Sequence, residues 1–197
     1  MRKDLDAPVI DSEAKLIGEV LGGYRGAIVE LLTELAKLES PSLEPDTQRS
    51  VQDLLQRLLE GLGFESHFFK GDTTGGHLHF WPVGHIPGEG PVQLLLGHTD
   101  TVWPVGTLKK MPVEYDKEGD VLRGPGVFDM KGGLVQMVFA LRALSELNLL
   151  PSVVPTVFLN SDEEVGSIES QPHIERLARQ SNRVLVLEPA LGPEGWL

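Results

Sequence analysis

The sequence predicts an α/β protein, a three-layer α/β/α sandwich around a mostly parallel mixed sheet. From Val92 onward, short apolar runs alternate with segments of helical periodicity, which is the pattern of parallel strands joined by helices. Hydrophobic residues make up 41% of the 197 positions, which is enough for the core of one large domain or of a domain plus part of another. Both observations favour one sheet covered by helices on its two faces.

Helical spacing of apolar residues predicts a first helix within residues 17–38. Glycines at positions 22, 23 and 26 weaken its first turns, so its firm part is expected to begin near Tyr24 and to end at Ser40-Pro41-Ser42. Residues 1–15 are a predicted polar lead-in. The further elements expected, in chain order, are a helix from Asp46 to Leu59, strands at 64–69, 78–83 and 92–96, a hairpin at 113–122, a helix from about Met130, a strand at 153–159, a helix around 173–180 and a strand at 184–187.

Turn and cap residues justify these boundaries. Asp46 is a suitable N-cap, and Gly61-Leu62-Gly63 is a suitable helix terminator. The run Lys117-Glu118-Gly119-Asp120 predicts the turn of the hairpin. The helix from Met130 carries its apolar residues on one face, as expected for a helix that covers a sheet.

The composition narrows the class of function. Seventeen basic against 29 acidic residues give a net charge of −12, which argues against nucleic acid as a partner and suits a cation site. Because the chain has no cysteine, a bound metal would need histidine and carboxylate ligands. Residues 1–13 lack the apolar core of a signal peptide, and no apolar run approaches transmembrane length. A soluble, cytoplasmic protein is therefore expected.

Polar residues able to bind a metal follow three of the predicted strands. These candidates are His98 and Asp100 after the strand at 92–96, Asp162, Glu163 and Glu164 after the strand at 153–159, and Glu188 after the strand at 184–187, with Asp129 just before the helix that starts near Met130. In open α/β sheets, ligands bind outside the carboxyl ends of the strands. We therefore expect all of these residues at one edge of one sheet.

Each candidate also has an ordinary structural role open to it. His98 could be a core histidine bonded to Asp100, Asp129 could cap the following helix, and Glu188 could be a simple strand-end acid. The acidic run after the strand at 153–159 could be a solvated turn. Neighbouring carboxylates repel one another unless a cation or a shared proton offsets the cost, so a metal site explains the whole set together.

The residue types fit zinc, which binds imidazole nitrogen and carboxylate oxygen at about 2.0–2.2 Å. His98 and Asp100 alternate along an extended segment, so Asp100 is expected to accept a hydrogen bond from His98 and not to bind metal itself. The side chains of Glu163 and Glu164 should diverge, so that one binds metal and the other takes a proton. Four candidate ligands favour two ions about 3.5–4 Å apart that share a carboxylate.

Four segments resemble successive motifs of the M20 metallopeptidases, with most similarity to the glutamate carboxypeptidase (carboxypeptidase G2-like) branch. They are LGHTDTV at 96–102, RGPGVFDMKGG at 123–133, SDEEVGS at 161–167 and LEP at 187–189. Their order and spacing cover the chain from about Lys15 to its end. The resemblance implies a zinc-dependent hydrolase in which metal-activated water cleaves an amide bond of a small peptide or N-acyl amino acid, releasing a C-terminal amino acid or an acyl group.

The resemblance also implies a role for each candidate. His98 and Glu188 would bind one zinc ion, Glu164 would bind the other, and Asp129 would bind both. Asp100 would orient the imidazole of His98, and Glu163 would be the general base. Cobalt or manganese could substitute for zinc. A glutamate at position 188 is typical of the carboxypeptidase branch. The resemblance further implies a cis peptide bond between Asp129 and Met130.

The chain departs from the family pattern near its end. Members continue into a lid or dimerisation domain and then return with a last histidine ligand, but none of the six histidines here follows Glu188. The resemblance therefore implies that residues 16–191 are the N-terminal part of an incomplete catalytic domain. Residues 192–197 would begin a connection to an absent lid, through which the whole protein would form a homodimer.

Two classes of function follow from this departure. An M20-type hydrolase is the preferred interpretation, with impaired activity expected for the 197-residue chain alone. The alternative is a non-catalytic metal-binding or interaction module or, within the family, an N-acyl-amino-acid deacylase or desuccinylase. The identity of the substrate is not determined by these residues.

Overall fold

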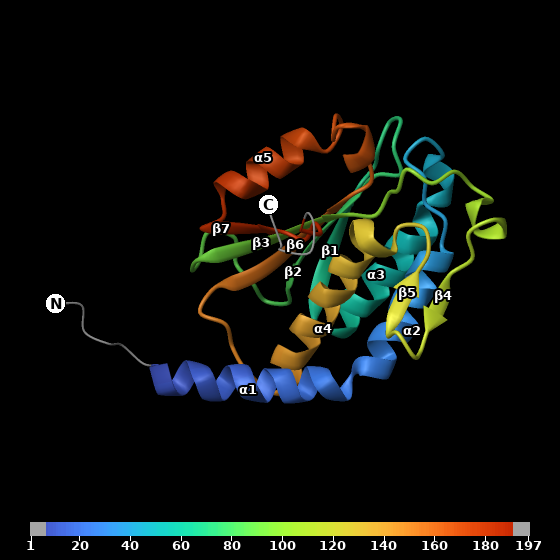
Figure 1. Ribbon diagram of the computed structural model, residues 1–197. Helices are drawn as coiled ribbons and strands as arrows, with labels where there is room; N and C mark the ends of the chain where they lie inside the picture. Colours follow the sequence, from blue (N-terminus) through green and yellow to red (C-terminus); the bar gives the residue numbers. More distant parts are fainter. Residues whose placement is uncertain (1–6, 191–197) are drawn as a thin grey trace.

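The computed structural model describes residues 7–190. The helices are α1 (Ala7–Gly23), α2 (Arg25–Lys37), α3 (Arg49–Gly61), α4 (Gly132–Glu146) and α5 (Gln171–Arg179); the strands are β1 (Phe64–Phe69), β2 (His77–Pro82), β3 (Val92–His98), β4 (Glu114–Asp116), β5 (Val121–Arg123), β6 (Val154–Asn160) and β7 (Arg183–Val186). Five strands form one sheet in the order β1-β2-β6-β3-β7, and β4 and β5 form the predicted hairpin. Helix α5 covers one face of the sheet and α1 to α4 lie on the other (Figure 1), so the predicted three-layer sandwich is confirmed.

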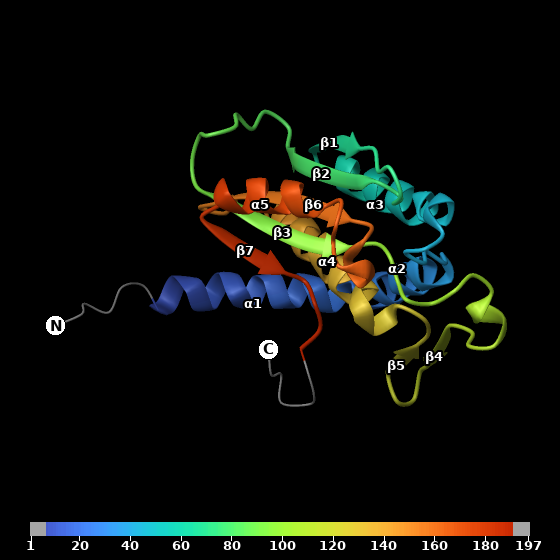
Figure 2. The same cartoon turned by 90° about the horizontal axis from the view of Figure 1, so that it is seen from above.

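Strand direction brings three carboxyl ends to one edge of the sheet. Strand β3 pairs in parallel with β6 on one side and with β7 on the other. Strands β1 and β2 add an antiparallel extension on the far side of β6. Figure 2 shows β3 and β7 running in the same direction, which places the residues that follow them close together.

Alternation along the strands supplies a core on each face of the sheet. Leu95 and Val157 pack with Leu134 of α4 on one face. Leu94 and Phe158, one position away in each strand, pack with Leu177 of α5 on the other face. The four strand residues in these two groups are all buried, and so is Leu134 of α4. This is expected for strands that are covered on both faces.

The N-terminal helices differ from the prediction. Helix α1 begins at Ala7, inside the predicted polar lead-in, and extends to Gly23, so the expectation of a firm helix only from Tyr24 is wrong. A glycine inside a helix costs only about 1 kcal/mol relative to alanine, and tertiary packing offsets such costs. Helices α1 and α2 both pack against α4, where the rings of Tyr24 and Phe139 lie 5.3 Å apart.

Two further predictions concern the C-terminal connection and membrane-spanning helices. The predicted connection at 192–197 lies outside the described residues, so the structure does not test it. Within residues 7–190, none of the helices has the length and apolar character needed to cross a bilayer.

A glycine at the start of α4 allows close approach of the chain that leaves β7. A Cβ atom added at Gly133 would lie 2.0 Å from the carbonyl oxygen of Leu187, the residue before Glu188. We predict that Gly133→Ala destabilises the fold by about 1–3 kcal/mol, because backbone must shift to accept the methyl group. Urea denaturation measures this change in the free energy of unfolding.

Gly26 of α2 provides the matched control for this prediction. It is an exposed helical glycine, and an added Cβ would meet no atom within 4 Å. Gly26→Ala should therefore leave stability unchanged or raise it by up to about 1 kcal/mol. Equal effects of the two substitutions would show that the approach of Leu187 to Gly133 is not a tight contact.

Candidate metal centre

The candidate residues come from four segments that meet at the carboxyl edge of the sheet. His98 is the last residue of β3, and Glu188 follows β7 by two positions. Glu163 and Glu164 begin a short helical turn, Glu163–Val165, after β6. Asp129 lies in the turn Val127–Lys131 that leads into α4, and its peptide bond to Met130 is cis, as the resemblance to the M20 metallopeptidases implied.

His98 forms the base of this cluster. Its side chain is 1% exposed, and its Nε2 atom lies 3.1 Å from Asp129 Oδ1, 3.3 Å from Glu188 Oε1 and 4.0 Å from Glu163 Oε2. The side chains of these three acids are 53%, 35% and 46% exposed, respectively. The arrangement is therefore a buried imidazole nitrogen that faces a partly open ring of carboxylates.

Asp100 occupies the other side of the imidazole. The Nδ1 atom of His98 lies 2.9 Å from the backbone carbonyl oxygen of Asp100 and 3.4 Å from its carboxylate oxygen Oδ1. The sequence predicted the carboxylate as the partner, and the structure places the carbonyl oxygen closer. With Nδ1–H donating to Asp100, Nε2 is left with a lone pair directed at the carboxylates, which is a repulsive arrangement unless a proton or cation lies between them.

The pKa values of the cluster reflect this crowding of negative charge. Burial lowers the pKa of His98, but the hydrogen bond and charge of Asp100 and the charges of Glu188 and Glu163 outweigh it and raise that pKa to about 9. Burial, followed by the charges of Asp129 and Glu163, raises the pKa of Glu188 to about 7, against the opposing effect of His98. Burial and then the charge of Asp129 raise the pKa of Glu164. A bound cation would reduce the electrostatic repulsion among these carboxylates.

The donor set fits a divalent metal such as zinc. His98 forms one possible ligand group with Glu163 and Glu188 and another with Asp129 and Glu164, and within each group the ligand atoms all lie within 4.8 Å of one another. Because Nδ1 faces Asp100, His98 has a single free nitrogen and can serve only one of the two groups. Two ions would therefore have to share a carboxylate, and Asp129, which contacts Nε2 and stands in the group with Glu164, is placed for that.

Asp162, the first acid of the run after β6, is directed away from the cluster. It is 1% exposed, and its Oδ2 atom accepts hydrogen bonds from the backbone N–H groups of Glu169 and Ser170 just before α5. Its Oδ1 atom accepts from the side-chain amide of Asn160. Asp162 therefore holds the turn that presents Glu163 and Glu164, and it stands in neither of the two possible ligand groups.

The structure adds residues for which the sequence analysis predicted no role. Ser42 donates a buried hydrogen bond to the Asp100 carboxylate, and Gln48 donates to the carbonyl oxygens of Pro41 and Ser161. The only local signal was that Ser40-Pro41-Ser42 interrupts a helical pattern, which indicates a loop but not what the loop contacts.

Of the cavities that border the described part of the sheet, one lies beside the cluster and another is larger. A cavity of about 310 Å³ opens beside Glu164; its other lining residues are Pro41, Ser42, Leu43, Glu44, Thr101, Val102, Pro104 and Val165. The lining is mainly apolar, and its only charged side chains are acidic. This cavity offers space for an apolar group next to the candidate ligand Glu164.

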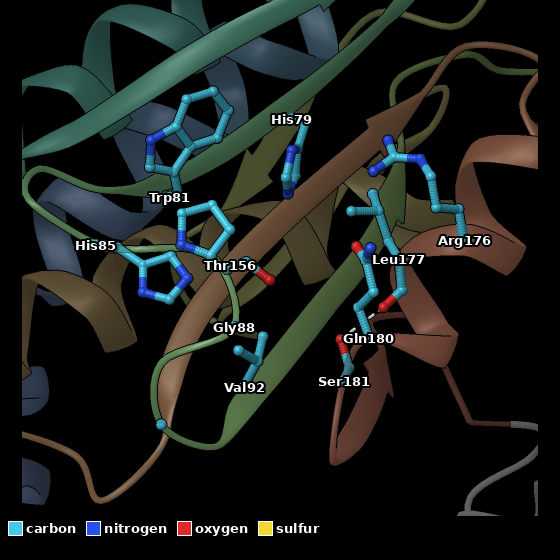
Figure 3. Close-up of a pocket in the computed structure, with 12 residues that line it drawn as sticks. His79, Trp81, His85, Gly88, Val92, Thr156, Arg176, Leu177, Gln180 and Ser181 are labelled. Atoms are coloured by element: carbon cyan, nitrogen blue, oxygen red, sulfur yellow. Dashed lines mark hydrogen bonds between the residues drawn. The ribbon is translucent and has the colours of Figure 1, made fainter.

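The second cavity, of about 680 Å³, lies between β2, the start of β6 and the C-terminal half of α5 (Figure 3). His79, Thr156 and Arg176 are among its lining residues, which include no carboxylate. It is larger than the cavity beside Glu164, but it contains none of the candidate ligands and no acid that could activate water. Geometry and chemistry together favour the carboxyl edge as the candidate active site.

Comparison with known proteins shows the family to which the chain is similar. Residues 94–195 match the family model described as Peptidase family M20/M25/M40. Carboxypeptidase G2 of Pseudomonas sp. is 34% identical over 166 residues, a match that covers 83% of this chain and 39% of that protein. Succinyl-diaminopimelate desuccinylase of Leptothrix cholodnii is 30% identical over 148 residues, covering 73% of this chain and 38% of that protein. The chain thus spans about two fifths of the length of these relatives.

Solved structures show the same fold at lower sequence identity. Human carnosine dipeptidase 1 superimposes with a TM-score of 0.73 at 18% identity, over 90% of this chain and 43% of its own. The dipeptidase Dug1p of Saccharomyces cerevisiae superimposes with a TM-score of 0.75 at 14% identity, over 89% of this chain and 41% of its own. These matches establish that the described sheet and helices are arranged as in those two proteins.

Proposed function

Because the chain belongs to peptidase family M20/M25/M40, we propose that it carries the metal-binding part of a zinc-dependent amide hydrolase. One observation carries the proposal: a buried histidine nitrogen, Nε2 of His98, faces the carboxylates of Asp129, Glu188 and Glu163 at the carboxyl edge of the sheet. The substrate class we propose is a small peptide or an N-acyl amino acid, in keeping with the names of the carboxypeptidase and desuccinylase relatives.

The proposed metal ligands are His98, Asp129, Glu164 and Glu188, with Asp129 shared between two ions. Zinc matches this set of one imidazole and several carboxylates, and cobalt or manganese could replace it. When bound, zinc supplies Lewis acidity to an amide carbonyl and to water at the site. Asp100 holds the imidazole by accepting from Nδ1–H, so that Nε2 remains free for the ligand role.

Glu163 is the proposed general base. Its carboxylate is about half exposed, and its Oε2 atom lies 4.0 Å from His98 Nε2, farther than the nearest oxygens of Asp129 and Glu188. That position lets Glu163 take a proton from water and return it to the leaving nitrogen of the amide. Its backbone N–H donates to Asp100 Oδ1, which fixes the turn from which the side chain extends.

The cavity beside Glu164 bears on the substrate. Its apolar lining suits an apolar portion of the substrate, and the carboxylates of Glu44 and Glu164 disfavour an anionic group there. We therefore propose that an N-acyl amino acid or peptide places an apolar group in this cavity. Two proposals remain. The resemblance implies homodimerisation through a lid domain, and the sequence patterns predict a cytoplasmic location.

The first experiment is to strip the purified chain of metal, reload it with zinc and measure zinc per chain by elemental analysis. We expect at least one bound zinc ion per chain, and no binding would contradict the metal site. The reloaded chain is then assayed for amino acid release from acetyl, benzoyl and succinyl amino acids. Hydrolysis supports the enzyme, whereas zinc binding without hydrolysis favours the alternative of a non-catalytic metal-binding module.

A further inference from the structure

A loop from the N-terminal part of the chain lies directly against the metal centre. The segment 40–42 runs alongside the segment 99–101. The N–H of Ser42 donates to the carbonyl oxygen of Thr101 at 3.2 Å, and the N–H of Thr101 donates to the carbonyl oxygen of Ser40 at 2.9 Å. The hydroxyl of Ser40 also donates to the carbonyl oxygen of Thr99 at 2.7 Å. The two backbone bonds fix Ser42 next to Asp100.

Ser42 makes the closest side-chain contact with the Asp100 carboxylate. Its hydroxyl donates to Asp100 Oδ2 at 2.6 Å. Both residues are buried, with Ser42 7% exposed and Asp100 1% exposed. The same oxygen accepts a longer bond, 3.2 Å, from the backbone N–H of Glu164. Asp100 Oδ1 accepts from the backbone N–H of Glu163 at 3.3 Å and lies 3.4 Å from His98 Nδ1.

The Asp100 carboxylate therefore joins two parts of the site. Through Oδ1 it faces the imidazole of His98, and through both oxygens it holds the backbone of the turn that presents Glu163 and Glu164. A rotation of this carboxylate would loosen the turn and remove one oxygen from beside the imidazole. The short bond from Ser42 is the contact best placed to prevent such a rotation, since the three other contacts are all longer than 3.1 Å.

We propose that Ser42 is a positioning residue for the metal centre. Its hydroxyl sets the orientation of the Asp100 carboxylate, and through it the orientation of His98 and of the turn at Glu163 and Glu164. The expected effect of Ser42 on metal binding rests on the proposed function. Its effect on the Asp100 carboxylate and on the turn at Glu163 and Glu164 does not. Ser42 also lines the cavity proposed for an apolar group of the substrate. Its hydroxyl bonds Asp100, which is not one of the proposed metal ligands, so its effect on metal binding passes through Asp100.

Zinc affinity provides the first test. Competition with a chromogenic chelator is expected to show about a tenfold weaker zinc affinity for Ser42→Ala, the low end of the range for loss of a residue that supports a metal ligand. Ser40→Ala is the matched control, because Ser40 is a buried serine of the same segment whose hydroxyl binds a backbone carbonyl and not Asp100. It should change the affinity less than about twofold. Ser42→Thr keeps the hydroxyl and should restore the affinity.

Hydrogen exchange provides a second test that needs no metal. In the metal-free protein, Ser42→Ala should lower the exchange protection of the Glu163 and Glu164 amides, while Ser40→Ala should leave it unchanged. Wild-type affinity and protection in Ser42→Ala would overturn the proposal, and so would equal losses in the two alanine variants. Loss of protection in Ser42→Ala with no zinc binding by the wild type would overturn the metal centre but support the role of Ser42 in holding Asp100.

Discussion

Glu163→Gln is expected to lower the turnover of the zinc-loaded protein by about 10²- to 10⁴-fold while leaving its zinc content unchanged. The amide keeps the shape of the side chain but cannot accept a proton from water. Because the Glu163 side chain is 46% exposed, the substitution should leave the fold intact. Steady-state hydrolysis of an N-acyl amino acid and elemental analysis of the same preparation measure the two quantities.

The neighbouring glutamate supplies the control. Glu164→Gln should lower the zinc content, because Glu164 stands in a ligand group with His98 and Asp129. The two variants would thus lose different properties: Glu163→Gln would lose catalysis, and Glu164→Gln would lose metal binding. Undiminished hydrolysis by Glu163→Gln would show that another group is the base, and loss of zinc from that variant would assign Glu163 as a ligand.

The sequence predicted the edge of the sheet where the site lies because two simple rules combine there. Apolar runs such as 92–96 mark buried strands, and parallel strands bring the residues after them to one edge. The positions of His98 and Glu188 follow from those rules, and the structure places their ligand atoms 3.3 Å apart. The helix starting at Ala7 did not follow from any local rule, because packing against α4 outweighs the glycines near its end.

Contacts between distant loops were beyond the sequence analysis for a different physical reason. The bond from Ser42 to Asp100 joins residues 58 positions apart, and its formation depends on how the loop after α2 folds over β3. A serine in a loop has no periodicity that could indicate its partner. Similarly, the proposed division of roles between Glu163 and Glu164 depends on the geometry of one short turn, which the amino-acid order alone does not specify.

His98→Ala is expected to weaken zinc binding by more than about 100-fold, beyond the range seen when only a supporting residue is lost. His98 supplies the one nitrogen in both possible ligand groups, and its Nε2 atom is the point on which the acids converge. Without it, the remaining carboxylates would hold zinc only through exposed oxygens that water competes for. Isothermal titration of the metal-free protein with zinc measures the change.

Thermal unfolding separates this effect from simple destabilisation of the fold. Free zinc at 100 times the dissociation constant should stabilise the wild-type chain by about 2.7 kcal/mol, and the same zinc concentration should leave His98→Ala almost unaffected. His79→Ala, on β2 and outside both ligand groups, should keep the full zinc-dependent stabilisation. If zinc stabilised His98→Ala as much as the wild type, the ion would have to bind elsewhere, and the convergence of acids on His98 would need an explanation that involves no metal.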